Sequence, residues 1–455
     1  MRGRALWQVR LVLMMGMIGA VTVIGFSGGT SSGGPRLISV QPFSVSSAET
    51  CEWPPANGYA DPAAAAPQGE SSPEPSETAR RAASLRKPDR IIADPYPSFT
   101  SVAVDPVRNE VVLTDQSLFN IMVYDRLVTT APTAAKTEPK RIIGGLRSKI
   151  EYQVGLYVDP ANGDIYVANN DTHDSMVVFS RQQQGDIPPE RLLYTPRGGF
   201  GIAVDEGAQE LYLTGQHDSW VTVWKKTARE NDSAVRLLQG DRTRLADPHG
   251  IALDTKARLM FVTNHGSFRP KHPGGAPSAN RGGGRNTGKQ NWPIMDPIPG
   301  GAQHLPPSIT IYAMDAQGDT APLRTIEGPN TQLNWPAGIS FDPRRNELYV
   351  ANDMGGSILV FSAAASGDVT PVRVLKGPKT GMKNPTGVAV DVQNDELWVA
   401  NFGNHTATVY KSTAAGDTPP LRIIRSSPAG VSALMIGNPG GVAYDTKRDE
   451  ILTPN

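Results

Sequence analysis

Short runs of alternating apolar and polar residues, each bounded by turn-forming residues, recur along the chain from about residue 86 to its end. They are rich in β-branched and aromatic residues, which is typical of β-strands. Successive copies of the clearest run start 46 to 54 residues apart, except for one spacing of 88. This regular period predicts a repeat architecture. The run ends in aspartate and occurs at 101–105, 155–159, 201–205, 250–254, 338–342, 387–391 and 441–445.

Each repeat contains four predicted strands in the same order. The strand that ends in aspartate is followed by a turn and by a second strand, such as ELYVAN at 347–352. A third strand, such as SILVF at 357–361, leads through a Gly-Asp turn to a fourth strand that begins with an arginine, such as Arg373. Four strands per unit of about fifty residues are typical of the blades of an all-β propeller.

The repeated motif resembles the NHL and YVTN repeats of extracytoplasmic, bacterial-type β-propellers. PTGVAVD at 385–391, followed by ELWVAN at 396–401, carries the resemblance, and its copies cover residues 86–455. The resemblance implies a propeller whose loop-rich face binds a protein, a peptide or a glycan. Propellers of this kind also include a zinc lyase with histidine ligands in its channel and calcium-dependent lactonases.

The number of blades and the way the ring closes are both predicted from strand counts. Seven first strands and seven arginine-led fourth strands predict a seven-bladed β-propeller with four-stranded blades. Arg90 begins a strand before the first blade, whereas the chain ends after the hairpin at 441–455. We therefore expect the strand near Arg90 to join this hairpin and close the ring, which protects strand edges. Either residues 37–45 supply the third strand of the closing blade, or that blade has three strands.

The N-terminal part of the chain predicts export. Three arginines precede an apolar run at 11–26, so residues 1–26 are typical of a signal peptide or an N-terminal anchor. Residues 27–85 are rich in Ser, Gly, Pro and Ala and predict a disordered linker. We therefore expect the propeller at 86–455 to be secreted or periplasmic, either free or anchored to a membrane through residues 11–26.

Composition narrows the range of partners and cofactors. Lys and Arg total 44, as do Asp and Glu, so the net charge is zero, and nucleic-acid binding has little support outside the basic insertion at 265–307. Cys51 is the only cysteine, which excludes an intramolecular disulfide and a cysteine-based zinc cluster. Motifs for haem, flavin or nicotinamide are also absent from the sequence. We expect a monomer.

Residues that recur in most repeats are assigned to the fold. We expect the aspartate that ends the first strand to order the following turn through its carboxylate. The asparagine that ends the second strand predicts a turn with positive φ. The arginine of the fourth strand predicts charge or backbone contacts at the outer edge of a blade. The Gly-Asp pairs predict hairpin turns.

Residues that depart from the repeat are the candidates for function. All seven histidines fall in loops that a propeller places on one face, namely His173, His217, His249, His265, His272, His304 and His405. The spacing of 88 comes from an insertion at 265–307 in the fourth blade, which is rich in Gly, Pro and Asn. A loop of this length is either functional or disordered, and we expect it beside the channel mouth.

His249 and His265 form the sharpest candidate pair. The hairpin of the fourth blade places His249 opposite Asn264 and diagonal to His265, a separation at which both imidazoles reach one metal ion. The sequence therefore predicts a possible zinc or calcium site at this pair. His217, Asp218 and Asp353 are candidate additional ligands. Two aromatic residues, Trp220 and Phe402, complete the candidate ligand-binding set on the same face.

Two functions follow from these features. The first is a non-catalytic, extracytoplasmic binding or scaffold propeller that presents its histidine- and loop-rich face to a protein, peptide or glycan. It is favoured by the regular repeats and by the absence of a recognisable nucleophile–base arrangement. The alternative is a metal-dependent lyase or hydrolase with its site at the channel mouth, in which His249 and His265 hold the metal.

Overall fold

The computed structural model describes residues 76–85, 94–170, 174–270 and 302–434, together with 443–445, 447 and 450–452. The chain divides into two units, 1–87 and 88–455. In the first, helix α2 (Glu77–Ser84) lies within the stretch predicted as a linker. None of the helices in the described part is long and apolar enough to cross a membrane. The predicted signal peptide or anchor at 1–26 lies outside the described residues.

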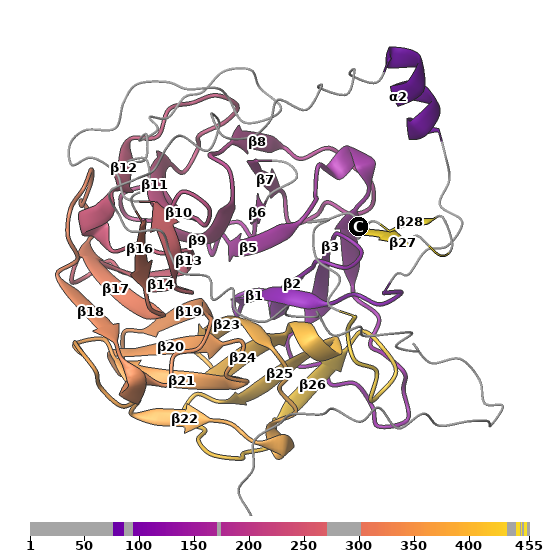
Figure 1. Cartoon of the computed structure of the whole chain (residues 1–455). Coiled ribbons are helices and arrows are strands. Elements are labelled where there is room, and N and C mark those ends of the chain that lie inside the picture. Colours follow the sequence, from indigo (N-terminus) through magenta and orange to yellow (C-terminus); the bar gives the residue numbers. More distant parts are fainter. Residues whose placement is uncertain are drawn as a thin grey trace, which may run out of the picture. The chain divides into compact units, whose positions relative to one another are not determined.

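The second unit contains six four-stranded antiparallel sheets, which are the blades of a β-propeller (Figure 1). Within each blade the strands pair in chain order. Blades one and two contain β1 (Phe99–Asp105), β2 (Glu110–Asp115), β3 (Asn120–Asp125) and β4 (Arg141–Gly144), then β5 (Gln153–Val158), β6 (Ile165–Asn169), β7 (Ser175–Phe179) and β8 (Arg191–Tyr194). Blade three contains β9 (Gly199–Asp205), β10 (Glu210–Gly215), β11 (Trp220–Lys225) and β12 (Arg236–Gln239).

The fourth blade is interrupted by the insertion. It contains β13 (Pro248–Asp254), β14 (Leu259–Asn264), β17 (Ser308–Ala313) and β18 (Arg324–Glu327). Between β14 and β17, the short strands β15 (Ser267–Pro270) and β16 (Ala302–Leu305) pair as a separate two-stranded sheet. Blades five and six contain β19 (Pro336–Asp342), β20 (Glu347–Asn352), β21 (Ser357–Ser362) and β22 (Arg373–Leu375), then β23 (Pro385–Asp391), β24 (Glu396–Asn401), β25 (Thr406–Lys411) and β26 (Arg422–Arg425).

The described blades number six, so the prediction of seven is wrong. The first strands of the blades contact one another in the order β1, β5, β9, β13, β19 and β23, and β23 in turn contacts β1. Six hydrophobic clusters each lie between two adjacent blades, and one of them joins the first blade to the sixth. In that cluster Phe99, Leu113 and Tyr124 pack with Trp398 and Val409. Because the sixth and first blades share a buried core, no seventh blade lies between them.

A repeated hydrogen bond links each blade to the next. At five junctions, the turn before the outer strand donates a backbone N–H to the carbonyl of the residue that follows the outer-strand arginine in the preceding blade. Gly185 thus bonds to Ile142 at 2.7 Å. The junction between the sixth and first blades uses the same bond, because the N–H of Thr130 donates to the carbonyl of Ile423 at 2.7 Å.

The C-terminal hairpin forms as predicted but outside the six blades. β27 (Ala443–Asp445) and β28 (Glu450–Leu452) pair only with each other as a two-stranded sheet. The predicted pairing of this hairpin with a strand at Arg90 is not shown, because Arg90 lies outside the described residues, as do residues 37–45. The direct contact between the first and sixth blades accounts for the smaller ring.

Three of the four recurring motifs have the predicted structural roles. The aspartate that ends a first strand accepts backbone N–H bonds from its turn; Asp342, for example, accepts one from Arg344 at 2.8 Å. In four blades the outer-strand arginine pairs with a glutamate of its own blade, as Arg373 does with both carboxylate oxygens of Glu347. In the other two, Arg191 and Arg324 donate to backbone carbonyls of the next blade. In the Gly-Asp turns the glycine has positive φ, and the aspartate accepts an N–H from the preceding blade, as Asp368 does from Asn330.

The predicted positive φ of the asparagine after the second strand is wrong. Asn169, Asn264, Asn352 and Asn401 are absent from the positive-φ residues, and Asn401 has a φ of −109°. All four side chains are buried, and those of Asn169, Asn264 and Asn352 bond to the connection between blades. Asn352, for example, accepts the N–H of Asn334 and donates to the carbonyl of Gln332. The asparagine recurs because its amide both donates and accepts, not because it tolerates a left-handed backbone.

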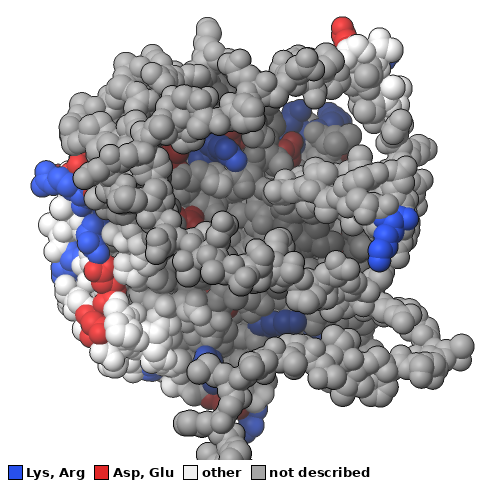
Figure 2. Space-filling view, in the orientation of Figure 1, with Lys and Arg blue, Asp and Glu red and all other residues white. Residues whose placement is uncertain are grey.

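The visible edge of the propeller carries charges of both signs. In Figure 2 the basic and acidic side chains of the described residues are interspersed over this edge, without a broad patch of one sign among them. This distribution agrees with the zero net charge of the sequence.

Candidate functional site

One end of the propeller collects a side chain from the same position in every blade. In each blade the residue after the second strand donates its N–H to the carbonyl of the residue that precedes the first strand, at 2.7 to 3.1 Å. We call these six the mouth residues: Gln116, Asn170, Gln216, His265, Asp353 and Phe402. Three of the predicted site residues, His265, Asp353 and Phe402, are therefore structurally equivalent. The repeat itself brings them to the same end of the fold.

A β-bulge at the start of β13 places His249 beside His265. In the fourth blade Pro248, not His249, pairs with Asn264, and the register shifts before Ile251 pairs with Val262. The predicted pairing of His249 with Asn264 is therefore wrong by one residue. A bulge re-aims side chains at the end of a strand. Here the result is close contact, since the ring centroids of His249 and His265 lie 3.3 Å apart with an angle of 17° between the rings.

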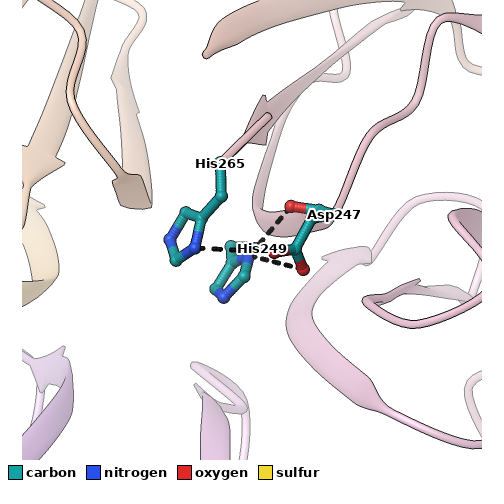
Figure 3. Close-up of side chains that lie close together, drawn as sticks. All are labelled: Asp247, His249 and His265. Carbon is teal, nitrogen blue, oxygen red and sulfur yellow. Dashed lines mark hydrogen bonds and ion pairs between the residues drawn. The ribbon is translucent and has the colours of Figure 1, made fainter. Parts of the chain in front are cut away.

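Asp247 completes a triad with the two histidines (Figure 3). One ligand atom from each of Asp247, His249 and His265 lies within 4.8 Å of the other two. The Asp247 carboxylate oxygens are 3.7 Å from Nδ1 of His249 and 3.9 Å from Nδ1 of His265. Asp247 has a φ of 57°, and its carbonyl accepts the N–H of His265 at 3.0 Å. The backbone thus holds the aspartate against the histidine pair.

The hydrogen bond of His249 sets its tautomer. Its Nδ1 lies 2.9 Å from the carbonyl oxygen of Asp247. Because a carbonyl oxygen only accepts hydrogen bonds, Nδ1 carries the proton in the neutral ring and Nε2 carries the lone pair. Metal-binding histidines are commonly oriented in this way, with one ring nitrogen donating to a carbonyl. His249 is therefore prepared to offer Nε2 as a ligand.

Burial keeps both imidazoles neutral. His249 is 3% exposed and His265 is 8% exposed. Desolvation by burial lowers the pKa of His249 to about 3. Burial, together with the neighbouring His249, also lowers the pKa of His265 well below its ordinary value. Since a metal ion binds the neutral imidazole, the pair is in its ligating form at neutral pH without having to release protons.

The donor set fits a divalent transition metal. Two imidazoles and one carboxylate form a ligand set typical of catalytic zinc, whereas calcium prefers oxygen ligands throughout. The buried Nε2 of His265 has no hydrogen-bond partner among the described residues, a costly state that a bound ion would relieve.

Two aromatic residues enclose the histidine pair. The Phe200 ring lies 3.9 Å from the His249 ring, between centroids. On the other side, the Trp335 indole stacks on His265 at 5.1 Å with an interplanar angle of 26°. Phe200 comes from blade three and Trp335 from blade five, so neighbours on both sides pack against the histidines of blade four. Their rings contribute to the low polarity around the imidazoles.

Asp353 and Phe402 are the mouth residues of blades five and six, and neither belongs to the triad. The N–H of Asp353 donates to the carbonyl of Trp335, and its carboxylate accepts a bond from the Asn384 side chain at 2.9 Å. Burial raises the pKa of Asp353 above its ordinary value. Phe402 is half-buried and begins the short 3-10 helix η5 (Phe402–Asn404) in the next blade.

The remaining candidates are more scattered. Trp220 is only 2% exposed and packs in the core between blades two and three, so it is not open to a ligand. His217 is exposed in the loop after β10 and lies close enough to His249 to lower its pKa. Asp218 is exposed in the same loop. His304 lies in β16 and is exposed. His173 and His272 lie outside the described residues.

His405 is buried, and its contacts hold parts of the fold together. Its Nδ1 lies 2.8 Å from the Pro97 carbonyl and 3.2 Å from the Ser98 hydroxyl, and its Nε2 lies 3.4 Å from the Asp94 carboxylate. Asp94 also accepts the N–H of Leu434. These contacts tie the segment before β1 to the sixth blade and to the segment after β26.

Asp247 and the two enclosing aromatics were not predicted as parts of the site. Strand alternation does not identify Asp247, because it precedes β13, has a φ of 57° and is followed by a bulge. Trp335 stands where the other blades have Ser98, Tyr152, Gly198, Asp247 and Asn384, and it is the only large residue among these six with positive φ. No local pattern identifies Phe200, because its contact with His249 depends on how two blades pack.

Comparison with known proteins gives a partial family match. Residues 304–419 match the model of the SMP-30/gluconolactonase/LRE-like region. No curated protein sequence matches the chain. The match covers the end of β16, then β17, β18, all of blade five and most of blade six. It does not include the triad.

Three solved structures with related folds show low sequence identity. Hydrazine synthase from Kuenenia stuttgartiensis has 12% identity and a TM-score of 0.45, covering 72% of this chain and 99% of that one. A nidogen/laminin complex has 15% identity and a TM-score of 0.41, covering 73% and 95%. A functionally unknown protein from Desulfotomaculum acetoxidans DSM 771 has 14% identity and a TM-score of 0.43, covering 75% and 88%.

The blades show that the chain is a β-propeller. Its repeats resemble those of the NHL and YVTN families, and its residues 304–419 are similar to the SMP-30/gluconolactonase/LRE-like region.

Proposed function

We propose that this protein is a metal-dependent hydrolase or lyase whose site lies at the mouth of the propeller. The observation that carries the proposal is the triad of Asp247, His249 and His265, two buried neutral imidazoles beside a carboxylate. Three protein ligands leave a coordination position open, which distinguishes catalytic zinc sites from closed structural ones. A bound ion would polarise a substrate oxygen or activate a water molecule.

The chain's own residues supply the remaining functions. His249 is oriented by its bond to the Asp247 carbonyl, so no reorganisation is needed before it binds a ligand. Phe200 and Trp335 keep the histidine pair in low-polarity surroundings. Asp353, in the next blade, is the proposed proton carrier, since it is held by Asn384 and adjoins Trp335.

The reaction class is supported by the family match. The SMP-30/gluconolactonase/LRE-like family includes lactonases, and the matched region contains Asp353. Hydrolysis of an ester or lactone adds water across a carbonyl carbon and displaces an alcohol, so it needs carbonyl polarisation and proton transfer. The triad is suited to polarising the carbonyl, and Asp353 is suited to transferring the proton.

Metal content of the purified full chain tests the triad. After exposure to zinc and dialysis, we expect about one zinc per chain in the native protein and less than about a tenth in H249Q/H265Q. His304→Gln is the matched control, because His304 is an exposed histidine outside the triad. Equal zinc retention by the native protein and a folded H249Q/H265Q variant would contradict the metal site.

Turnover tests the enzymatic part separately. A panel of simple esters and lactones is assayed with the zinc-loaded protein, with the chelated protein and with D353N. We expect activity that is lost on chelation, is restored by zinc and falls at least tenfold in D353N. A zinc-loaded protein that hydrolyses none of them, and cleaves no carbon–oxygen or carbon–nitrogen bond in lyase assays, is not an enzyme of the proposed kind.

A non-catalytic binding propeller is the second candidate. It is favoured by exposed apolar residues in loops at the same end as the mouth residues: Leu118 and Phe119 in blade one and Met354 in blade five. Exposed apolar groups of this kind support association with a protein or peptide, and amide-bearing neighbours suit a glycan. Peptide and glycan arrays probed with the purified chain test it, with F119S and M354S as the variants expected to reduce binding.

We also propose that the propeller acts outside the cytoplasm as a monomer. The support is the arginine-flanked apolar run at 11–26 in the sequence. Fractionation of expressing cells is expected to recover the propeller outside the cytoplasm. Recovery of the full-length chain from the cytoplasm would contradict this. Light scattering of the purified chain tests the oligomeric state.

A further inference from the structure

Trp335 occupies a backbone position that is unfavourable for a large side chain. Its φ is 55°, in the left-handed region, and it precedes Pro336. The equivalent positions in blades three, four and six also have positive φ and contain Gly198, Asp247 and Asn384. Glycine, aspartate and asparagine tolerate this conformation, whereas for a bulky residue it is an outlier. Blades one and two have Ser98 and Tyr152 here without positive φ, so among these six equivalent residues only Trp335 combines a large side chain with a left-handed backbone.

The indole is also exposed although it is large and apolar. Trp335 is 51% exposed, and one of its contacts is the ring of His265 at 5.1 Å. An exposed indole contributes little burial to offset the backbone strain. A strained and exposed residue that stacks on a candidate metal ligand is a sign of a functional position rather than of core packing.

We propose that Trp335 is a stacking platform for an aromatic ring of the ligand, whose oxygen donor reaches the triad of Asp247, His249 and His265. The inference deepens the proposed function and rests on it for the second point of contact. Offset stacking on the indole holds the ring, and the oxygen is presented to the open coordination position. The ligand class is thus an aryl compound with an adjacent carbonyl, carboxylate or hydroxamate oxygen.

The surroundings favour a neutral aromatic group over an anionic one at the platform. Two acidic residues are linked to the platform: the Asp247 carboxylate lies 3.9 Å from Nδ1 of the His265 ring on which Trp335 stacks, and the Asp353 N–H donates to the Trp335 carbonyl. The negative charges of Asp247 and Asp353 would repel a ligand carboxylate, which disfavours an anionic group stacked on the indole. The oxygen donor of the ligand is therefore expected at the triad end.

Binding of two hydroxamates to the zinc-loaded protein tests the platform. Benzohydroxamate and acetohydroxamate carry the same metal-binding group, and only the first has a ring. We expect benzohydroxamate to bind about tenfold more tightly, and the preference to disappear in W335N. A preference close to one in the native protein, or one that W335N leaves unchanged, would overturn the proposal.

The stability of W335N provides an independent measurement. Asparagine is the residue found at the equivalent position of blade six, so the platform proposal expects W335N to unfold at the same or a higher urea concentration than the native chain. A clear loss of stability would show that the indole is structural, and would overturn the proposal. W335F keeps a ring and is expected to retain part of the benzohydroxamate preference.

Failure of the metal site can be distinguished from failure of the platform. If the native chain binds no zinc, the proposed function fails, and saturation-transfer NMR with benzamide and acetamide then tests the platform without a metal. A benzamide signal that is lost in W335N supports the platform. Absence of a benzamide signal from the native chain overturns it.

Discussion

The N–H of Thr130 in the first blade donates a hydrogen bond to the carbonyl of Ile423 in the sixth, at 2.7 Å. This bond repeats the link between the other neighbouring blades, where a turn residue such as Gly416 donates to an outer-strand carbonyl such as that of Val374. The side chain of Thr130 adds a second contact by accepting the N–H of Arg425. The junction between the two ends of the six-blade series therefore uses the same geometry as the rest.

Removing this donor should weaken the junction. We expect Thr130→Pro to lower the free energy of unfolding by about 1–3 kcal/mol, because proline has no N–H and leaves the Ile423 carbonyl only the longer bond from the Thr129 hydroxyl. Thr130→Ala is the matched control, since it keeps the N–H and loses only the hydroxyl contacts. Urea unfolding measures both variants. Equal stability of the two would show that the backbone bond contributes nothing.

His405 should be required for stability but not for zinc binding. It is fully buried, and its ring contacts Pro97, Ser98 and Asp94. We expect His405→Phe to lower the free energy of unfolding by about 1–3 kcal/mol, since it leaves buried polar groups without partners. The exposed His304→Phe change should alter stability by less than about 0.5 kcal/mol. Thermal unfolding and zinc content are measured together, and a loss of zinc in folded His405→Phe would contradict this assignment.

The buried histidine pair should make the metal-free protein less stable in acid. An imidazole in the unfolded chain titrates near pH 6.5, whereas burial lowers the pKa of His249 to about 3 and that of His265 well below its ordinary value. Between these values the unfolded chain binds protons that the folded protein does not. The free energy of unfolding therefore falls as the pH is lowered from about 6.5 toward 3.

A matched variant separates this contribution from that of the other acidic and basic groups. Urea unfolding of the chelated protein is measured at several pH values for the native chain and for H249Q/H265Q. Both share all remaining titrating groups, so the difference in slope belongs to the histidine pair. We expect a flatter pH dependence for the double variant over this window. Identical slopes would mean that the pair titrates normally in the folded protein.

The pairing of the outer-strand arginine with the second-strand glutamate should stabilise a blade measurably. The two terminal guanidinium nitrogens of Arg373 each donate to a carboxylate oxygen of Glu347 at 2.6 Å, and the guanidinium carbon lies 5.8 Å from the Tyr349 ring centroid. Both side chains are mostly buried. We expect Arg373→Met to cost about 1.5–3 kcal/mol in urea unfolding.

An exposed ion pair provides the comparison. Lys136 and Glu138 lie 2.9 Å apart with 49% and 72% of their side chains exposed. Lys136→Met should change stability by less than about 1 kcal/mol, since solvent screens an exposed pair. A similar cost for Arg373→Met and Lys136→Met would show that the buried geometry of the blade pair adds nothing.

The sequence alone predicted the strands of the blades and the first two members of the site. The aspartate-terminated run and its neighbours correspond to β1, β5, β9, β13, β19 and β23, because strand propensity and turn residues act over a few neighbouring positions. The proximity of His249 and His265 was also predictable, since both belong to one hairpin. The bulge that pairs Pro248 with Asn264 was not, since it depends on the local ladder.

What the sequence determined by itself is the repeating unit: four strands, their turns, and the placement of His265, Asp353 and Phe402 at equivalent positions. What only the tertiary structure decided is how many units form the series and which side chains from different blades meet. The contact of Thr130 with Ile423, and the stacking of Trp335 on His265, join residues of separate blades. Such contacts depend on the packing between twisted sheets, which no local pattern of residues encodes.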